Sequence, residues 1–307
     1  MSLAVVVAAP TSAALPYTID SAGRRAAGQE VPERIDRILA GLLDGGGAVV
    51  PADPSCLARA ERLIGEVHDR AYLDHLRAPV APLDDRFAAP GLRQETPLTA
   101  EAGDGAREAA RCAVQAAELA VRRGGHAYAL VRPPGHHAGP GWYGGYCFLN
   151  NAVIAARTLL EEGVARVGVA DLDYHLGNGT MACLREEPRL RYASIHSSSP
   201  ADFPFRFPEG PGLTGLPADP DPPVYLTALE ATLEELAVGA EALVVSVGYD
   251  ILDRDPHGSW SLPPGIFAPI GALLAGRGLP LVFVQEGGYG LALLRPAARA
   301  LAQEVCT

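Results

Sequence analysis

Short apolar runs alternate with longer amphipathic segments along most of the chain. The short runs are rich in valine and are bounded by glycine or polar residues, which is typical of buried β-strands. In the longer segments, apolar residues recur every three or four positions, as on a helix that buries one face. This alternation predicts an α/β fold, with a central, mostly parallel sheet flanked by helices on both faces.

The apolar pattern places each element in turn. The predicted strands are residues 1–7, 127–131, 166–170, 192–196, 243–247 and 281–284. The predicted helices are residues 32–44, 56–64, 70–76, 106–123, 150–162, 227–237 and 266–274. Residues 18–28, 77–105 and 197–223 lack a regular pattern and are expected to be loops. Neither an internal repeat nor a domain boundary is visible, so residues 1–307 are expected to form a single domain.

Four of the predicted strands run directly into polar residues or glycine. Because ligand crevices of parallel sheets form at the carboxyl ends of the strands, these polar groups are expected to meet in one crevice. The four segments are His136–His137, Asp171–His175, Gly248–Asp250 and Glu286–Tyr289.

The segment Asp171–His175 has the composition of a metal site. In an extended chain, residues two apart share a face, so Asp171, Asp173 and His175 should project together. Carboxylate and imidazole ligands suit zinc, iron or manganese, and a catalytic metal needs three protein ligands and one open position. Asp173, His175 and Asp250 could supply these three ligands. Asp253 and Asp255 follow in the same loop as Asp250 and compete for its role.

The histidine pair and the glycine-rich turn could supply the remaining catalytic groups. His136 and His137 follow a Pro-Pro-Gly turn, and hydrolysis at a metal needs a general base and a general acid. Each imidazole could be oriented by an acceptor such as Asp171 or Asn178. The hydroxyl of Tyr289 could stabilise a developing oxyanion. Any one of these motifs alone would be read as a loop, a packed histidine or a turn.

Composition narrows the class of protein. A hydrophobic content of 48% indicates a compact fold, and a net charge of −11 argues against nucleic-acid binding while leaving a cationic substrate acceptable. Five scattered cysteines argue against a disulfide framework and against a cysteine zinc site. The N-terminus lacks the basic region of a signal peptide, and no segment has the length of a membrane span. We therefore expect a cytoplasmic protein with neither a nucleic-acid nor a membrane partner.

These motifs together resemble the histone deacetylase family, and within it the bacterial acetylpolyamine amidohydrolases. They occur in the family's order from about residue 30 to 290, which is nearly the whole chain. The matching segments are Arg132–Ala138, Gly145–Asn151, Asp171–His175 with Gly177–Thr180, Gly248–Asp250 with Asp255–Pro256, and Glu286–Tyr289.

The resemblance implies an arginase–deacetylase fold and a zinc-dependent amidohydrolase. Such an enzyme removes an acetyl or related acyl group from a primary amine, most simply an acetylpolyamine or acetyl-lysine. It implies one Zn²⁺ per chain, a structural K⁺ or Na⁺, and a possible homodimer. The residues that match the family's zinc ligands are Asp173, His175 and Asp250. Those that match its catalytic groups are His137 as general base and acid, His136 as its partner, Asp171 and Asn178 as their acceptors, and Tyr289 as the group that polarises the carbonyl. Those that match its substrate channel are Gly145, Tyr146, Phe203 and, at the rim, Glu95. Those that match its monovalent-cation site are Asp171, Asp173, His175, Ser194 and Ile195.

Departures from the family pattern leave alternatives open. Leu176 stands where the family usually has a second histidine, and Ser197–Pro200 replaces a loop typical of the acetylpolyamine enzymes. A deacetylase that acts on a biosynthetic intermediate is therefore an alternative. A binuclear manganese ureohydrolase would need an aspartate two residues after Asp250, where Leu252 stands. An inactive deacetylase-like binding protein is the remaining alternative, although every matched catalytic position holds a competent residue.

Overall fold

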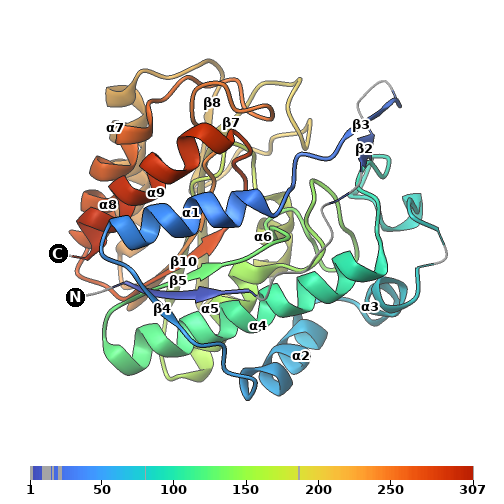
Figure 1. The fold of residues 1–307 in the computed structure, drawn as a ribbon, viewed down its shortest axis with the longest axis horizontal. Coiled ribbons are helices and arrows are strands. Elements are labelled where there is room, and N and C mark those ends of the chain that lie inside the picture. The colour runs from blue at the N-terminus through green and yellow to red at the C-terminus, as the bar shows by residue number, and fades with distance from the viewer. Residues whose placement is uncertain are drawn as a thin grey trace.

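The centre of the molecule is a parallel sheet of eight strands in the order β4–β1–β5–β10–β9–β6–β7–β8 (Figure 1). The computed structural model describes residues 3–8, 15, 17–19, 23–79, 81–185 and 187–306. Every neighbouring pair of strands in this sheet is parallel. The strands are β1 (Ala4–Val7), β4 (Ala48–Val50), β5 (His126–Leu130), β6 (Val167–Asp171), β7 (Leu190–Ser197), β8 (Leu213–Leu216), β9 (Ala242–Val247) and β10 (Leu281–Gln285). A separate antiparallel pair joins β2 (Tyr17–Ile19) to β3 (Arg25–Ala27).

Helices cover both faces of the sheet (Figure 1). On one face lie α1 (Glu33–Asp44), α7 (Pro222–Ala237), α8 (Phe267–Ala275) and α9 (Leu291–Val305). On the other face lie α2 (Cys56–Val67), α4 (Ala100–Arg123) and α5 (Asn151–Glu161). Near these lie the shorter helices α3 (Arg70–Arg77) and α6 (Asn178–Leu184) and the 3₁₀ turn η1 (Asp85–Phe87), whereas the 3₁₀ turn η2 (Pro264–Ile266) packs with α8 and α9 on the first face. The predicted α/β architecture is therefore confirmed.

The core divides into two apolar clusters because strand side chains alternate between the faces of a sheet. In β5, Tyr128 and Leu130 point into the cluster under α1 and α9. Ala127 and Ala129 point into the cluster under α4 and α5. Helix α4 is itself rich in buried alanine, so small side chains meet small side chains there. All four of these strand residues are fully buried.

The structure corrects several predicted loops. Helix α4 begins at Ala100 rather than at residue 106, because the Thr99 hydroxyl accepts from Ala102 N at 3.2 Å and caps the helix. The predicted loop 18–28 contains parts of β2 and β3, and the predicted loop 197–223 contains β8. Strand β4 and helices α6 and α9 were not predicted, since their apolar runs are short or their sequences resemble turns. Residues 1 and 2 of the predicted first strand lie outside the described residues.

Four adjacent central strands carry the polar segments predicted from the sequence. In spatial order they are β5, β10, β9 and β6, and they are followed by the segments that contain His136, Glu286, Asp250 and Asp173. Because all four strands are parallel, these segments leave the sheet at the same edge. The fold thus brings together side chains that are separated by about 150 positions in the sequence.

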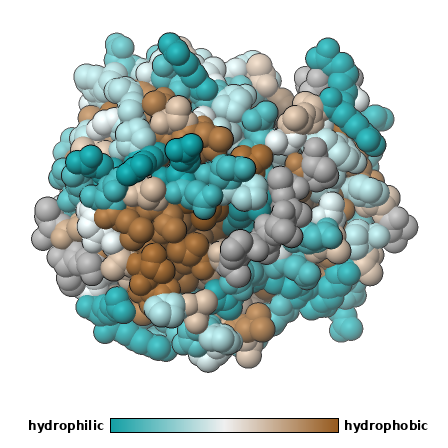
Figure 2. All heavy atoms as spheres, viewed as in Figure 1, coloured by the Kyte–Doolittle hydropathy of each residue, from teal (hydrophilic) through white to brown (hydrophobic). Residues whose placement is uncertain are grey.

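Strand β4 forms one edge of the sheet, and this edge is open. Val49 in the edge strand β4 is 51% exposed, and Leu43 at the end of α1 is 44% exposed. Figure 2 shows an apolar area on this side of the molecule. Within the described part of the chain, no helix combines the length and the hydrophobicity needed to cross a membrane.

Candidate active site

Asp173, His175 and Asp250 form a compact group of potential metal ligands. One ligand atom from each lies within 4.8 Å of the others. The Nδ1 atom of His175 is 3.2 Å from Asp173 Oδ1 and 3.2 Å from Asp250 Oδ2. The remaining carboxylate oxygens accept backbone N–H groups, Asp173 Oδ2 from Gly287 and Asp250 Oδ1 from Tyr174. Each residue therefore directs one potential ligand atom at the same region, an arrangement that fits a divalent metal.

The charges in this group also call for a cation. Asp173 and Asp250 are fully buried. Burial and the Asp173 carboxylate raise the pKa of Asp250 to about 7. Burial disfavours a charged His175, but hydrogen bonds to the two carboxylates outweigh this and raise its pKa to about 10. Two buried carboxylates that compete for one imidazole are stabilised by an additional positive charge.

The histidine pair is held by two different acceptors. His136 Nδ1 lies 3.2 Å from Asp171 Oδ2, and His137 Nδ1 lies 2.7 Å from Asn178 Oδ1. The two ring centroids are 4.0 Å apart. Burial lowers the pKa of His137 well below its usual value, and the neighbouring His136 lowers it further. His137 is therefore neutral at neutral pH and able to take a proton at Nε2.

Helix α6 places Asn178 beside His137. A Cβ atom at Gly179 would lie 2.4 Å from the main-chain carbons of His137 and Ala138. Only glycine allows the first turn of α6 to approach this backbone so closely. The hydrogen bond from Thr180 N to His136 O, at 3.0 Å, ties the two segments together. The sequence Asn-Gly-Thr, which resembles a turn, is thus the start of a helix that orients the histidine.

A channel of about 300 Å³ leads to these groups. Gly145 forms part of its wall, where a Cβ atom would lie 2.4 Å from His137 Cδ2. Phe203 packs edge-on against His137 at 4.6 Å, and Tyr146 lies 5.6 Å from Tyr289 between ring centroids. The residues predicted to line a channel are therefore gathered around one cavity, with the metal-ligand group also in its lining.

Tyr289 is held from both sides of its turn. Its ring lies 4.4 Å below the guanidinium of Arg34. Its backbone N–H donates to Asp255 Oδ2 at 2.6 Å, and Gly290 N donates to the same oxygen at 2.9 Å. Asp255 thus braces the tyrosine turn and is not a rival of Asp250 for the metal. Asp253 instead pairs with the exposed Arg254 at 3.4 Å.

Sequence reasoning missed two residues at the channel. Arg34, which was read only as part of a helix start, is fully buried and donates to the carbonyls of Glu286 and Gly288. His257 lies in the channel lining, with Nε2 3.3 Å from the Tyr146 hydroxyl. Its position directly after Asp255–Pro256 was the available signal. An arginine that reaches a turn some 250 positions away could not be assigned from local pattern.

A second group of potential ligands, His136, Cys147 and Glu286, also has atoms within 4.8 Å of one another. Their donor atoms are already used within the protein. Glu286 accepts from Gly135 N, His136 N and the Ser246 hydroxyl. Burial raises the pKa of the Cys147 thiol well above its usual value, so it stays protonated. This group is therefore explained by hydrogen bonding rather than by a second metal.

The remaining predicted site residues lie close by. Glu95 Oε1 accepts from Gly145 N at 2.5 Å and from the Thr96 hydroxyl at 2.8 Å, and Glu95 lines both the channel and the cleft outside it. Asp171 pairs in register with Ser194, which precedes Ile195 on β7. The Ser194 hydroxyl lies 3.0 Å from His196 Nδ1.

Comparison with known proteins places this chain in a family. Residues 28–305 match the histone deacetylase domain. The chain is 31% identical to the acetylpolyamine amidohydrolase of Mycoplana ramosa, with 85% of this chain and 87% of that protein aligned. It is 33% identical to the acetylpolyamine amidohydrolase of Burkholderia pseudomallei, with 93% of each chain covered.

Solved structures of related proteins have the same fold as this chain. The crystal structure of an acetylpolyamine aminohydrolase from Burkholderia pseudomallei superposes with a TM-score of 0.84 at 31% identity, over 99% of this chain and 98% of that one. The HDA15 HD domain superposes with a TM-score of 0.80 at 22% identity, over 99% of this chain and 88% of that one, and so shows the fold alone. The predicted arginase–deacetylase fold and the enzyme class are confirmed, and the chain belongs to the histone deacetylase family.

Proposed function

We propose that the protein is a zinc-dependent deacetylase that hydrolyses the amide bond of a small N-acetylated amine. The observation that carries this proposal is the convergence of Asp173 Oδ1, Asp250 Oδ2 and His175 Nδ1 at the end of a channel that also holds His137 and Tyr289. Oxygen and imidazole donors of this kind suit zinc. The names of the relatives make an acetylpolyamine the first substrate to test.

The chain's own residues account for the proton transfers. When bound at the Asp173 group, zinc would supply a Lewis acid and lower the pKa of a water molecule. Neutral His137, oriented by Asn178, takes the proton of the attacking water at Nε2 and returns it to the departing amine. The hydroxyl of Tyr289 donates a hydrogen bond to the carbonyl oxygen as negative charge develops there. His136, held by Asp171, stabilises the charge that His137 acquires.

The other predicted positions complete the proposal. Tyr146, Phe203 and Gly145 enclose the acyl-amine chain, and Glu95 at the channel mouth attracts its cationic end. Asp171, Ser194 and Ile195, together with Asp173 and His175, would hold a structural K⁺ or Na⁺. A ureohydrolase is disfavoured because Leu252 is an apolar side chain and is 2% exposed.

The decisive experiment measures initial rates on N-acetylputrescine, an acetyl-lysine peptide and a longer-acyl lysine, with chelator and with zinc added back. Turnover that disappears with chelator and returns with about one zinc per chain supports the proposal. Turnover that survives complete removal of the metal contradicts it. No turnover of any of these substrates with zinc bound would contradict the proposal and favour the alternative, a deacetylase that acts on a biosynthetic intermediate.

A further inference from the structure

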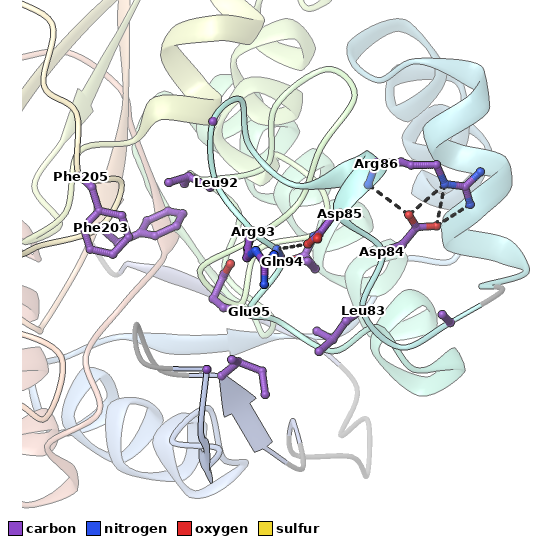
Figure 3. A pocket seen from close by; sticks show the side chains of 14 residues that line it. Leu83, Asp84, Asp85, Arg86, Leu92, Arg93, Gln94, Glu95, Phe203 and Phe205 are labelled. Atoms are coloured by element: carbon purple, nitrogen blue, oxygen red, sulfur yellow. Dashed lines mark hydrogen bonds and ion pairs between the residues drawn. The ribbon is translucent and has the colours of Figure 1, made fainter.

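An outer cleft continues from the catalytic channel. It has a volume of about 950 Å³ and shares Ile19, Glu95, Phe203 and Phe205 with the channel. Figure 3 shows Phe203 and Phe205 on one wall, the Leu83–Arg86 segment on the other side, and Arg93 to Glu95 between them. A substrate whose acetamide reaches the metal-ligand group therefore leaves its far end in this cleft.

Two of the acidic groups in the cleft already have internal partners. Asp84 forms a forked ion pair with Arg86, with nitrogen–oxygen distances from 2.5 to 3.1 Å. Asp85 Oδ1 accepts from Gln94 N at 2.8 Å (Figure 3). Asp84 and Asp85 therefore already have partners within the cleft wall.

Glu95 lines both the cleft and the channel, Arg93 two positions before it lines the cleft, and both stand on a braced segment. Gln94, between them, is buried and donates through Nε2 to Tyr143 O at 3.2 Å. Ile19 N donates to Glu95 O at 2.9 Å. The segment is thus held from both sides, so that Arg93 and Glu95 border the cleft from a fixed backbone.

Both side chains retain binding capacity. Among the described residues, the hydrogen bonds of the Glu95 carboxylate to Gly145 N and the Thr96 hydroxyl both use Oε1, which leaves Oε2 for a ligand. Burial raises the pKa of Glu95 because it disfavours the charged carboxylate. A substrate cation beside Glu95 would stabilise that charge. Arg93 is exposed and makes neither an ion pair nor a hydrogen bond with another residue in the described part of the chain. One side chain can therefore accept a cation while its neighbour two positions away can bind an anion.

We propose that Glu95 and Arg93 bind the α-ammonium and the α-carboxylate of an amino acid, so that the preferred substrate is a free side-chain-acetylated diamino acid such as Nε-acetyl-lysine. This inference rests on the proposed deacetylase chemistry and narrows its substrate. The methylene chain of such a substrate occupies the aromatic channel, and its zwitterionic end meets one acceptor and one donor side chain. A polyamine would satisfy Glu95 but would bring its further ammonium groups beside the guanidinium of Arg93.

Three substrates that share a chain of four methylene groups separate these contributions. N-acetylputrescine carries only an ammonium group at its far end, 5-acetamidopentanoate carries only a carboxylate, and Nε-acetyl-lysine carries both. All three present the same acetamide and the same methylene chain to the channel. With the zinc-loaded enzyme, we expect kcat/KM to be highest for Nε-acetyl-lysine. The difference should appear in KM, because the far end does not touch the reacting atoms.

Variants of Arg93 test whether this residue binds the α-carboxylate of the substrate. Arg93→Gln should lower the ratio of kcat/KM for Nε-acetyl-lysine to that for N-acetylputrescine by roughly threefold to tenfold, the range of a partly exposed charged hydrogen bond. Arg93→Lys should restore part of this ratio. Arg37→Gln is the matched control, because it removes the same charge from an exposed residue of α1 outside the cleft lining, and it should leave the ratio unchanged.

The outcomes are distinct. A higher kcat/KM for N-acetylputrescine than for Nε-acetyl-lysine, or a ratio that Arg93→Gln does not lower, overturns the amino-acid assignment while the deacetylase function stands. If the zinc-loaded enzyme hydrolyses none of the three substrates nor an acetyl-lysine peptide, the proposed function fails and this inference fails with it.

Discussion

The Nδ1 atom of His137 lies 2.7 Å from the side-chain oxygen of Asn178, a neutral acceptor. The same atom of His136 lies 3.2 Å from the carboxylate of Asp171. Burial disfavours charge on both rings. For His136 the Asp173 and Asp171 carboxylates outweigh this and raise its pKa to about 10, whereas the pKa of His137 stays well below its usual value. The two adjacent histidines thus differ in protonation because the Asp173 and Asp171 carboxylates favour a charged His136, whereas His137 is buried beside His136 and has a neutral acceptor.

Exchanging the neutral acceptor for a carboxylate should shift the pH dependence of catalysis. In Asn178→Asp, an adjacent negative charge favours the protonated imidazole and raises the pKa of His137. A smaller fraction of His137 is then neutral at a given pH, so the acidic limb of the kcat/KM profile should move to higher pH by about one unit or more. The profile should be measured on zinc-loaded enzyme of matched metal content. An acidic limb in the same place would remove His137 from the role of general base.

The hydroxyl of Tyr289 should matter for turnover and not for metal binding. Removing one oxyanion donor typically costs roughly 10²–10³ in kcat, and we expect Tyr289→Phe to fall in this range with unchanged zinc content. Tyr225→Phe is a matched control, because the Tyr225 hydroxyl is buried and has no hydrogen-bond partner among the described residues. Wild-type turnover in Tyr289→Phe, or an equal loss in Tyr225→Phe, would contradict the proposed role.

Asp250 should destabilise the metal-free protein at neutral pH and increase its affinity for the metal. Its pKa rises from 3.8 to about 7 in the folded chain, so the folded state holds a proton that the unfolded state has lost between these values. The free energy of unfolding of the metal-free protein therefore falls as pH rises from about 4 to 7, by on the order of a few kcal/mol. Asp250→Asn should remove this loss and melt at a higher temperature than the wild type in chelator at pH 7.

With excess zinc the order should reverse. The wild type gains the free energy of metal binding, whereas Asp250→Asn lacks a ligand and should bind zinc at least about tenfold more weakly. Thermal melts with chelator and with zinc, combined with metal analysis, test both halves. An Asp250→Asn variant that binds zinc like the wild type would show that Asp250 is not a ligand.

His68 should make the protein sensitive to acid. It is buried, with Nδ1 2.8 Å from Gly139 O and Nε2 accepting from Asn150 N at 3.0 Å, so the neutral ring satisfies both partners. Burial lowers its pKa from 6.5 to about 4. Between these values the unfolded state binds the additional proton, so the stability present above pH 6.5 is lost as the pH falls towards 4. The loss for this group is about 3 kcal/mol.

The matching measurement is denaturant unfolding at several pH values. His68→Gln should be less stable than the wild type at pH 7, because at least one buried hydrogen bond is lost, but its stability should depend less on pH between 6.5 and 4. Equal pH slopes in the two proteins would show that protonation of His68 does not drive the acid destabilisation.

Local pattern was sufficient for much of this molecule. The runs at 127–131, 166–170, 243–247 and 281–284 are apolar on both faces because their strands lie in the middle of a sheet that is covered on both sides. Their polar ends stand out because only one edge of such a sheet can hold ligand-binding groups. The family resemblance and the residues of the metal-ligand group followed from these segments.

The elements that sequence reasoning missed depend on tertiary contacts. Strand β4 has only three residues, too short a run to be recognised as a strand from the sequence, and it forms by pairing with β1. Helix α6 begins with Asn-Gly-Thr and is stabilised by its close approach to the backbone after the Pro-Pro-Gly turn. Helix α4 extends beyond its apolar pattern for a local reason, because the side chain of Thr99 caps it three residues before Ala102. In each case contacts outside the local apolar pattern override weak local preference.

The sequence by itself determined the α/β class, the buried strands and the residue types at their carboxyl ends, because hydrophobic periodicity and covalent order are local properties. Only the tertiary structure decided the strand order that sets β5, β10, β9 and β6 side by side, and with it the convergence of Asp173, His175 and Asp250. It also decided that Arg34 reaches Tyr289 and that Glu95 stands beside Gly145. Apart from the Asp173–His175 pair, these contacts join residues about 50 to 250 positions apart, and their geometry depends on how whole elements pack rather than on any neighbouring residue.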